Sequence, residues 1–292
     1  MGTVDIRSLL DFARFKPLAA WSLSSAVLGA SLAFFLSGGE IAEPWPMAAA
    51  MVCIVLMQYV SHPLNDITDR ELDARAAIAA TGRRKPLVNG SATVREARML
   101  SASIVAVILF IMAGLVAFRP VLIVPASYGM FALLGYSHSK LRLSYRPFTE
   151  MYLGVPVNMI AVLAIAYIGA GTFSPLSVMV AIAFGFAASS LFVSMMSMDY
   201  AADRSDRKET TVVRYPRSHW CAAFPAIGLL AFIFSLPFAA ASLSVAALIS
   251  MAALSTATFL VLITIGAKAD RLRFDYLDGL SNSMEARSNS LR

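Results

Sequence analysis

The chain has 292 residues, of which 58% are hydrophobic and only 14% charged, and its mean hydropathy is +0.70. Soluble domains average about 25% charged residues, so this composition excludes a soluble fold of this length. The formal net charge is +6. Such a surplus can reflect nucleic-acid binding, but its distribution along the chain indicates a membrane instead.

Eight apolar runs follow one another along the chain. Each run is about 20 residues long, which is the length of a helix that crosses a bilayer. They cover residues 17–37, 46–64, 99–117, 120–137, 151–171, 175–198, 219–240 and 243–266. Because these runs lack the polar faces of soluble helices, we predict an all-α fold, a polytopic membrane bundle with eight transmembrane helices.

Lys and Arg are distributed asymmetrically over the loops between these spans. With eight spans, all of them except Arg119 fall on the side that holds both termini. Basic loops remain in the cytoplasm, so we predict cytoplasmic termini and an inner or cell membrane of a prokaryote. The positive charge then reflects orientation and attraction to anionic membrane lipids, and no nucleic-acid partner is expected.

The long polar loops lie on this same side, at 66–98, 138–150 and 199–218. We predict a single membrane domain over residues 1–266, which includes these loops. Residues 267–292 are polar and rich in Ser, and we expect a cytoplasmic tail that is partly disordered.

The first acidic cluster begins at the end of the second span. Asn65, Asp69 and Asp73 fall at i, i+4 and i+8, so on a helix they share one face. Oxygen ligands of this kind, with the neighbouring Asp66, are typical of Mg²⁺ sites, where the ion also binds substrate phosphates. A solvated helix end with Arg partners explains the same residues without a metal.

A second cluster at the end of the sixth span strengthens the metal interpretation. Asp199 and Asp203 again share a helical face, and Asp199 follows directly on an apolar segment. Acidic residues at such a depth usually face a cavity or a partner. Two facing carboxylate pairs can hold two or more Mg²⁺ ions and clamp a diphosphate. The alternative is a second solvated helix end.

Basic and aromatic side chains on the same side fit this interpretation. Arg84, Lys140, Arg142 and Lys208 are candidates for contacts with diphosphate oxygens, although the positive-inside rule also explains them. Tyr136 ends the fourth span, where it either stabilises a carbocation with its ring or anchors the helix at the interface.

These motifs resemble those of the UbiA superfamily of membrane prenyltransferases. Asn65, Asp69 and Asp73 match the family's N-x-x-x-D-x-x-x-D motif, and the Arg84-x-Pro-Leu-x-x-Gly stretch resembles family members. Asp199 and Asp203 match the second motif. Its third position is Arg207, where the family more often has Asp or Gly, and Asp206 lies one residue early.

The resemblance implies a helical bundle around a central cavity, with a lateral opening to lipid and a cytoplasmic cap. The family usually has nine spans, whereas eight are predicted here. It further implies an enzyme in which two Mg²⁺ ions bind a prenyl diphosphate and Asp69, Asp73, Asp199, Asp203 and Tyr136 act in catalysis. The expected reaction is ionisation to an allylic cation, then attack by an aromatic or quinone-precursor acceptor, as in quinone biosynthesis.

Two other functions remain open at this stage. Membrane terpene cyclases of the same superfamily ionise a prenyl diphosphate without an acceptor, and they often alter the acidic motifs, as Arg207 does here. An ion-coupled transporter also pairs carboxylates, but at mid-membrane. Acceptor identity, prenyl chain length and oligomeric state are left open by the sequence.

Overall fold

The computed structural model describes Phe12 and residues 14–75, 85–137 and 140–289. All regular structure within these residues is helical. Lipid tails offer the backbone no hydrogen-bond partners, so an apolar spanning segment must satisfy its amides internally, as a helix does. Eight described helices are long and apolar enough to cross a membrane, which confirms the predicted number of spans.

The spans follow the predicted order. The first four are η1–α3 (Ala19–Leu23 and Ser24–Leu36), α4 (Pro44–Thr68), α7 (Val94–Phe118) and η2–α8 (Pro120–Leu122 and Ile123–Ser137). The other four are η4–α9 (Glu150–Gly154 and Val155–Ala170), α10 (Pro175–Met198), α13 (Trp220–Ala240) and α14 (Val245–Asn289). Short helices between them are α2 (Phe15–Leu18), α5 (Arg70–Arg75), α6 (Pro86–Asn89), η3 (Leu143–Tyr145), α11 (Tyr200–Ser205) and α12 (Thr211–Arg214).

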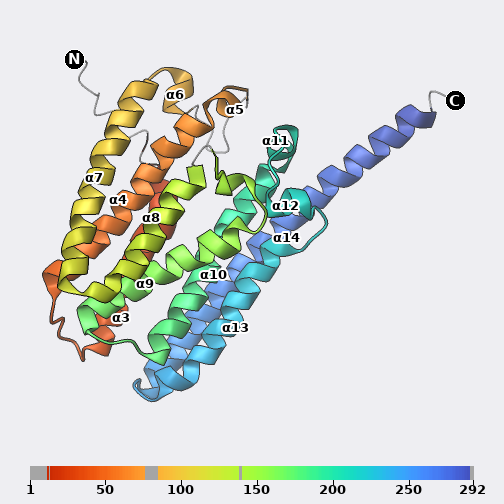
Figure 1. Cartoon of the computed structure of the whole chain (residues 1–292). Helices are drawn as coiled ribbons and strands as arrows, with labels where there is room; N and C mark the ends of the chain where they lie inside the picture. Colours follow the sequence, from red (N-terminus) through yellow and green to blue (C-terminus); the bar gives the residue numbers. More distant parts are fainter. Residues whose placement is uncertain (1–11, 13, 76–84, 138–139, 290–292) are drawn as a thin grey trace.

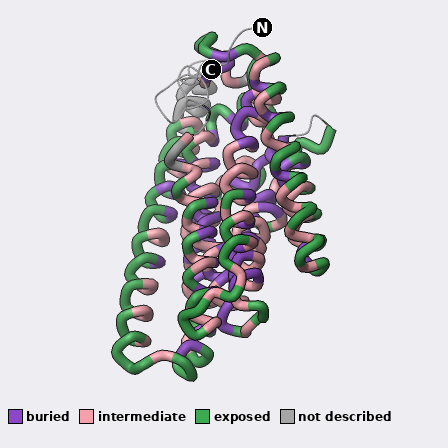
Figure 2. The backbone as a smooth tube through the Cα atoms, turned by 90° about the vertical axis from the view of Figure 1, so that its left-hand side faces the viewer, coloured by how far each residue is buried: buried purple, intermediate pink, exposed green. Residues whose placement is uncertain are grey.

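Helix α9 is the central element of the bundle, because it contacts α3, α4, α8 and α10. Beyond α10 lie α13 and α14, and beyond α4 lies α7. The short helices α5, α6, α11 and α12 all lie at one end of the bundle (Figure 1), which we call the motif end. Buried residues run through the interior, while the outer faces of the helices are exposed (Figure 2), as expected of a bundle that contacts lipid.

Close helix contacts depend on small residues, as is common in membrane bundles. A Cβ added at Gly29 of α3 would lie 2.8 Å from the Ile165 Cβ of α9. A Cβ added at Gly266 of α14 would lie 2.2 Å from the carbonyl oxygen of Cys221 in α13. Only glycine permits the backbones to approach so closely at these two positions.

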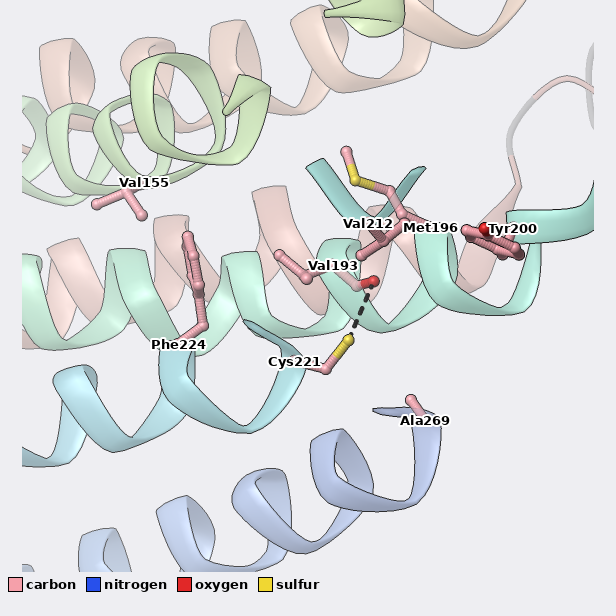
Figure 3. Close-up of a cluster of buried hydrophobic side chains, with 8 residues drawn as sticks. All are labelled: Val155, Val193, Met196, Tyr200, Val212, Cys221, Phe224 and Ala269. Carbon is pink, nitrogen blue, oxygen red and sulfur yellow. Dashed lines mark hydrogen bonds between the residues drawn. The ribbon is translucent and has the colours of Figure 1, made fainter. Parts of the chain in front are cut away.

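A hydrophobic cluster beneath the motif end joins the last three spans. Val193 and Met196 of α10, Phe224 of α13 and Ala269 of α14 meet in this cluster, together with Val212 of α12 (Figure 3). All five are buried. The cluster therefore fixes the end of α10, from which the second acidic motif begins.

The predicted disorder of the polar tail is wrong for most of its length, because α14 continues as helix through Asn289. At about 1.5 Å per residue, a helix of 45 residues extends well beyond the hydrocarbon core of about 30 Å. Figure 1 shows it projecting past the motif end. The spanning part supplies a ready nucleus, and adding turns to a formed helix costs little.

Two buried charges attach this extension to the bundle. Arg273 and Asp270 are each 1% exposed, and Arg273 Nη2 lies 2.8 Å from Asp270 Oδ1. Arg273 also donates to the Pro216 carbonyl at 2.8 Å and to the Ser197 hydroxyl of α10. Asp270 accepts the backbone N–H of Ala222 at 3.2 Å, at the start of α13, where a negative charge complements the helix dipole.

We expect Arg273→Ala to destabilise the protein by about 3–5 kcal/mol, because it leaves the buried Asp270 carboxylate without its cation. Thermal unfolding of the purified protein in detergent measures this loss. Arg271→Ala is the matched control, since Arg271 is exposed on the same helix. Equal unfolding temperatures for the two variants would contradict the assignment of Arg273 as the anchor of α14.

Candidate active site

A cavity of about 1250 Å³ opens at the motif end and continues into the spanning part of the bundle. Near the motif end its wall carries carboxylates and lysines, and deeper in the bundle it is mainly apolar. From Gly154 to Ile168, two residues on its wall, α9 rises about 21 Å at 1.5 Å per residue. The cavity is therefore amphipathic, with a charged mouth and an apolar interior.

The first motif lies on the wall of this mouth. Asn65, Asp69 and Asp73 all line the cavity. Helix α4 ends at Thr68, yet the backbone hydrogen bonds from Asp69 to Asn65 and from Asp73 to Asp69 continue at 2.8 Å each. The predicted i, i+4, i+8 stack is thus retained across the junction with α5.

The second motif is built in the same way. Helix α10 ends at Met198, and the Asp203 amide donates to the Asp199 carbonyl at 2.9 Å as α11 begins. Asp199 and Asp203 both line the same cavity as the first motif. The structure therefore brings together the two clusters that the sequence predicts to face each other.

Lys208 connects the two motifs. Its ammonium lies 3.7 Å from an Asp69 oxygen and 3.5 Å from an Asp203 oxygen. The Tyr145 hydroxyl donates to Asp69 at 2.8 Å, and the Lys208 ammonium lies 4.8 Å from the centre of the Tyr145 ring. The Glu209 amide in turn donates to the Tyr145 carbonyl at 3.0 Å. Segments after α8 and after α11 thus form a cover over the mouth.

Asp66 occupies a different environment from its neighbours in the motif. It is 1% exposed and is not among the residues that line the cavity. It pairs with Arg14, and Lys85 lies 3.4 Å from it and 2.7 Å from Asp73. These ion pairs give Asp66 a role in holding Arg14 and Lys85 at the cavity wall.

The remaining predicted residues are placed as follows. Tyr136 lines the cavity, and its ring centre lies 6.3 Å from that of Phe192. Lys140 and Arg142 are exposed and are not on the cavity wall, and the Arg142 guanidinium stacks 4.3 Å from the Tyr145 ring centre. Arg84 lies outside the described residues.

Sequence reasoning missed Arg14 and Tyr145 and gave Lys85 no preference. Lys85 precedes Pro86 and belongs to the basic run Arg83-Arg84-Lys85. This position could have identified it as a candidate site residue. Arg14 and Tyr145 reach Asp66 and Asp69 from segments distant in the sequence, so no local pattern marks them. Asp206 lines the cavity, whereas Arg207 is exposed and has φ 57°.

Electrostatics at the mouth favours a bound cation. Burial raises the pKa of Asp73, Asp199 and Asp203, and for Asp203 the neighbouring Asp199 and Asp69 add to this effect, giving a pKa of about 6. Lys208 opposes the shift at Asp203. Each raised pKa means that a carboxylate is held where its charge is costly, which a divalent ion would relieve.

The donor set fits Mg²⁺. The carboxylates and the Asn65 amide offer hard oxygen ligands, and five Asp but only three basic side chains line the cavity. Among the described residues, no three acidic, His or Cys side chains form a closed metal site. Mg²⁺ commonly uses one or two carboxylates and takes its other ligands from water and substrate phosphates, so an open arrangement suits it.

These features are those of an integral, multi-pass helical membrane protein with an acidic cavity, and comparison with family models specifies the family. The model described as the UbiA prenyltransferase family matches residues 24–276. Because the match covers most of the chain, the protein belongs to this family, as the two motifs predict.

Solved structures share the fold at low sequence identity. A UbiA homolog from Archaeoglobus fulgidus, bound to GPP and Mg²⁺, is 18% identical, with a TM-score of 0.64 over 92% of this chain and 97% of that one. An apo UbiA homolog from Aeropyrum pernix K1 is 16% identical, with a TM-score of 0.57 over 97% and 100%. A structure described for digeranylgeranylglyceryl phosphate synthase is 13% identical, with a TM-score of 0.61 over 94% of each chain. No curated protein sequence matches the chain.

We expect Mg²⁺ affinity to fall as the pH drops through about 6, because Asp203 then takes up a proton and loses its charge. An Asp with an ordinary pKa of about 3.9 would remain charged over this range. Calorimetric titration of Mg²⁺ into the purified protein between about pH 5 and about pH 7.5 tests this expectation. Asp203→Asn should weaken Mg²⁺ binding above pH 6 and flatten its pH profile. If the Mg²⁺ affinity of the wild-type protein does not change over this pH range, the prediction is contradicted.

Proposed function

We propose that the protein transfers a prenyl group from a prenyl diphosphate to an aromatic or quinone-precursor acceptor within the membrane, with Mg²⁺ as cofactor. The observation that carries this proposal is the single cavity, which combines both acidic motifs at its mouth with an apolar interior. A prenyl diphosphate has the same division, with a charged head and an apolar tail. Family membership and the A. fulgidus structure with GPP and Mg²⁺ support the same substrate.

We assign the metal ligands to Asn65, Asp69, Asp73, Asp199 and Asp203, which suffice for two ions shared between the motifs. Asp66 is the weakest of the predicted ligands because Arg14 and Lys85 already pair with it. When bound, Mg²⁺ neutralises the diphosphate as it leaves. Lys208 is placed to contact a diphosphate oxygen, since its ammonium lies between Asp69 and Asp203.

Tyr136 is the residue we assign to the reacting carbon. It lines the cavity beside the acidic mouth, at the level where the charged wall gives way to the apolar one. Its ring and that of the adjoining Phe192 can stabilise an allylic cation through their π faces. Ionisation at this point would place the cation away from bulk water, which protects it from hydrolysis.

The orientation follows from charge. All Lys and Arg except Arg119 belong to the side of the motif end, so we propose that this end and the active site face the cytoplasm.

A terpene cyclase of the same superfamily is the second candidate, which the replacement of the third acidic position by Arg207 favours. Incubation with a prenyl diphosphate alone separates the two, since a cyclic hydrocarbon product would defeat the transferase proposal.

Asp69→Ala and Asp199→Ala should each lower diphosphate release at least about 100-fold, because metal stabilisation of a leaving group is worth several kcal/mol. Release is measured with a prenyl diphosphate and a panel of acceptors, with products identified by mass spectrometry. Asp275→Ala is the control, as Asp275 is exposed on α14. Normal turnover in either active-site variant would exclude the two-metal assignment.

The apolar interior predicts a second result. Ala164 of α9 lines the deep part of the cavity, so Ala164→Phe should shorten the longest prenyl chain that is accepted and leave short diphosphates unaffected. Competition among prenyl diphosphates of increasing length measures this shift. Ala106→Phe, on the exposed face of α7, is the matched control. An unchanged length profile for Ala164→Phe would place the tail elsewhere.

A further inference from the structure

We propose that Asn158 and Ser189 form the acceptor subsite of this cavity, and that it takes a neutral ring with hydroxyl or carbonyl groups, such as a hydroquinone. This inference rests on the proposed function, because it concerns the second substrate of the same reaction. It is carried by the Ser189 hydroxyl, which has no partner among the described residues, and by the weakly bonded Asn158 amide oxygen. Both residues line the membrane-spanning part of the cavity, away from the charged mouth.

Ser189 is the first such group. It is 1% exposed and lines the cavity, yet its hydroxyl has no hydrogen-bond partner within the part of the chain that the structure describes. Serines within helices usually donate to a carbonyl of the preceding turn. In the same helix Ser190 donates to Ala187 at 2.6 Å, and Ser194 donates to Ser190 at 2.8 Å. Ser189 differs from these neighbours because its hydroxyl makes no such bond within the helix and is available to a ligand in the cavity.

Gly154 gives the Ser189 hydroxyl its space. A Cβ at Gly154 would lie 2.9 Å from Ser189 Oγ, so a larger residue there would crowd the hydroxyl. The Gly154 carbonyl also accepts a hydrogen bond from Asn158 Nδ2 at 2.8 Å. Asn158 and Ser189 therefore both lie against Gly154, one from α9 and the other from α10.

Asn158 keeps an acceptor atom for a ligand. Because the Gly154 carbonyl can only accept, Nδ2 must face it and Oδ1 must point away. Among the described residues, Oδ1 has one printed partner, the Ser25 hydroxyl at 3.4 Å, and this bond is weak because the same hydroxyl donates its hydrogen to the Trp21 carbonyl at 2.7 Å. Asn158 is half-buried on the cavity wall, and a ligand hydroxyl that donates to its weakly bonded Oδ1 would be stabilised there.

Aromatic rings connect this pair to the reacting carbon. The Trp21 indole N–H donates to the Ala188 carbonyl at 2.9 Å, which fixes the ring beside Ser189. The Trp21 and Phe192 ring centres are 6.3 Å apart, and Phe192 is 6.3 Å from Tyr136. All three rings line the cavity. A planar acceptor held at Asn158 and Ser189 would thus meet aromatic surfaces that lead to the charged mouth.

Charge decides which acceptor fits. Within the described lining, the Lys and Arg side chains are Arg14, Lys85 and Lys208, and each is already paired with an Asp at the motif end. Asn158 and Ser189 are neutral. A carboxylate on the acceptor would have no cation beside this pair, and an unpaired charge at membrane depth is costly. A hydroquinone instead offers one hydroxyl to donate to Asn158 Oδ1 and a second oxygen to accept from Ser189.

The same hydroxyls make the ring electron-rich, as an attacking acceptor must be. In the transfer, a bond forms between a ring carbon and C1 of the prenyl group while the C1–oxygen bond to diphosphate breaks. The ring carbon then loses its proton, which leaves with the diphosphate. The products are the prenylated hydroquinone, diphosphate and one proton, so no oxidant or reductant is consumed.

The test measures acceptor binding apart from turnover. Methylhydroquinone, kept reduced, is titrated into the protein and followed by quenching of Trp21 fluorescence in a Trp45→Phe/Trp220→Phe background. Ser189→Ala and Asn158→Leu should each raise its Kd about tenfold, the loss expected for one buried hydrogen bond of about 1.4 kcal/mol. Ser190→Ala is the matched control and should leave the Kd unchanged. 4-Hydroxybenzoate should bind at least about tenfold more weakly than methylhydroquinone.

Unchanged Kd values in both variants, equal weakening by Ser190→Ala, or tighter binding of 4-hydroxybenzoate would each overturn the subsite. The KM of the acceptor should rise in the two variants while the KM of the prenyl diphosphate stays constant, which a general loss of structure would not produce. If the hydroquinone binds as expected but no prenylated product forms, the subsite stands and the proposed transfer reaction fails.

Discussion

Carboxylates held at the edge of a membrane bundle require nearby positive charge, and this requirement organises the motif end. Asp66 pairs within the protein with Arg14 and Lys85, both through its Oδ1. The cavity-facing acids share Lys85 and Lys208 and remain in excess over the cations around them. Burial raises the pKa of Asp73, Asp199 and Asp203, and the neighbouring carboxylates add to this effect at Asp203. An arrangement of this kind is stable enough to fold and leaves binding energy to be gained from a metal and a diphosphate.

The division of the cavity into a charged mouth and an apolar interior follows from where the helices end. The first motif begins at Asn65 in the last turn of α4, the second begins at Asp199 directly after α10, and both continue in a short helix. The Thr68 hydroxyl donates to the Ser137 carbonyl at 2.7 Å, which holds the end of α4 beside the end of α8 and Tyr136. Tyr136 and the first acidic motif therefore line neighbouring parts of the same cavity wall.

Spacing in the sequence was sufficient to predict the spans and the two motifs, because helical periodicity and apolar length are local properties. Spacing could not show that Asp69 lines the cavity whereas Asp66 is held in ion pairs. The difference depends on Arg14 and Lys85, which come from other parts of the chain. Tyr145 and Lys208 depend in the same way on contacts between distant loops. The polar tail was predicted to be partly disordered because composition hides the buried Asp270–Arg273 pair.

Arg273 also sets an order for the biogenesis of the protein. A chain is synthesised from its N-terminus, so Ser197 of α10 and the start of α13 emerge from the ribosome before Arg273 does. Until that point the end of α10 lacks the guanidinium that joins it to α13 and α14. The second aspartate motif therefore lacks this anchor until Arg273 has been translated. The contacts that fix the end of α10 are thus completed after both acidic motifs have been made.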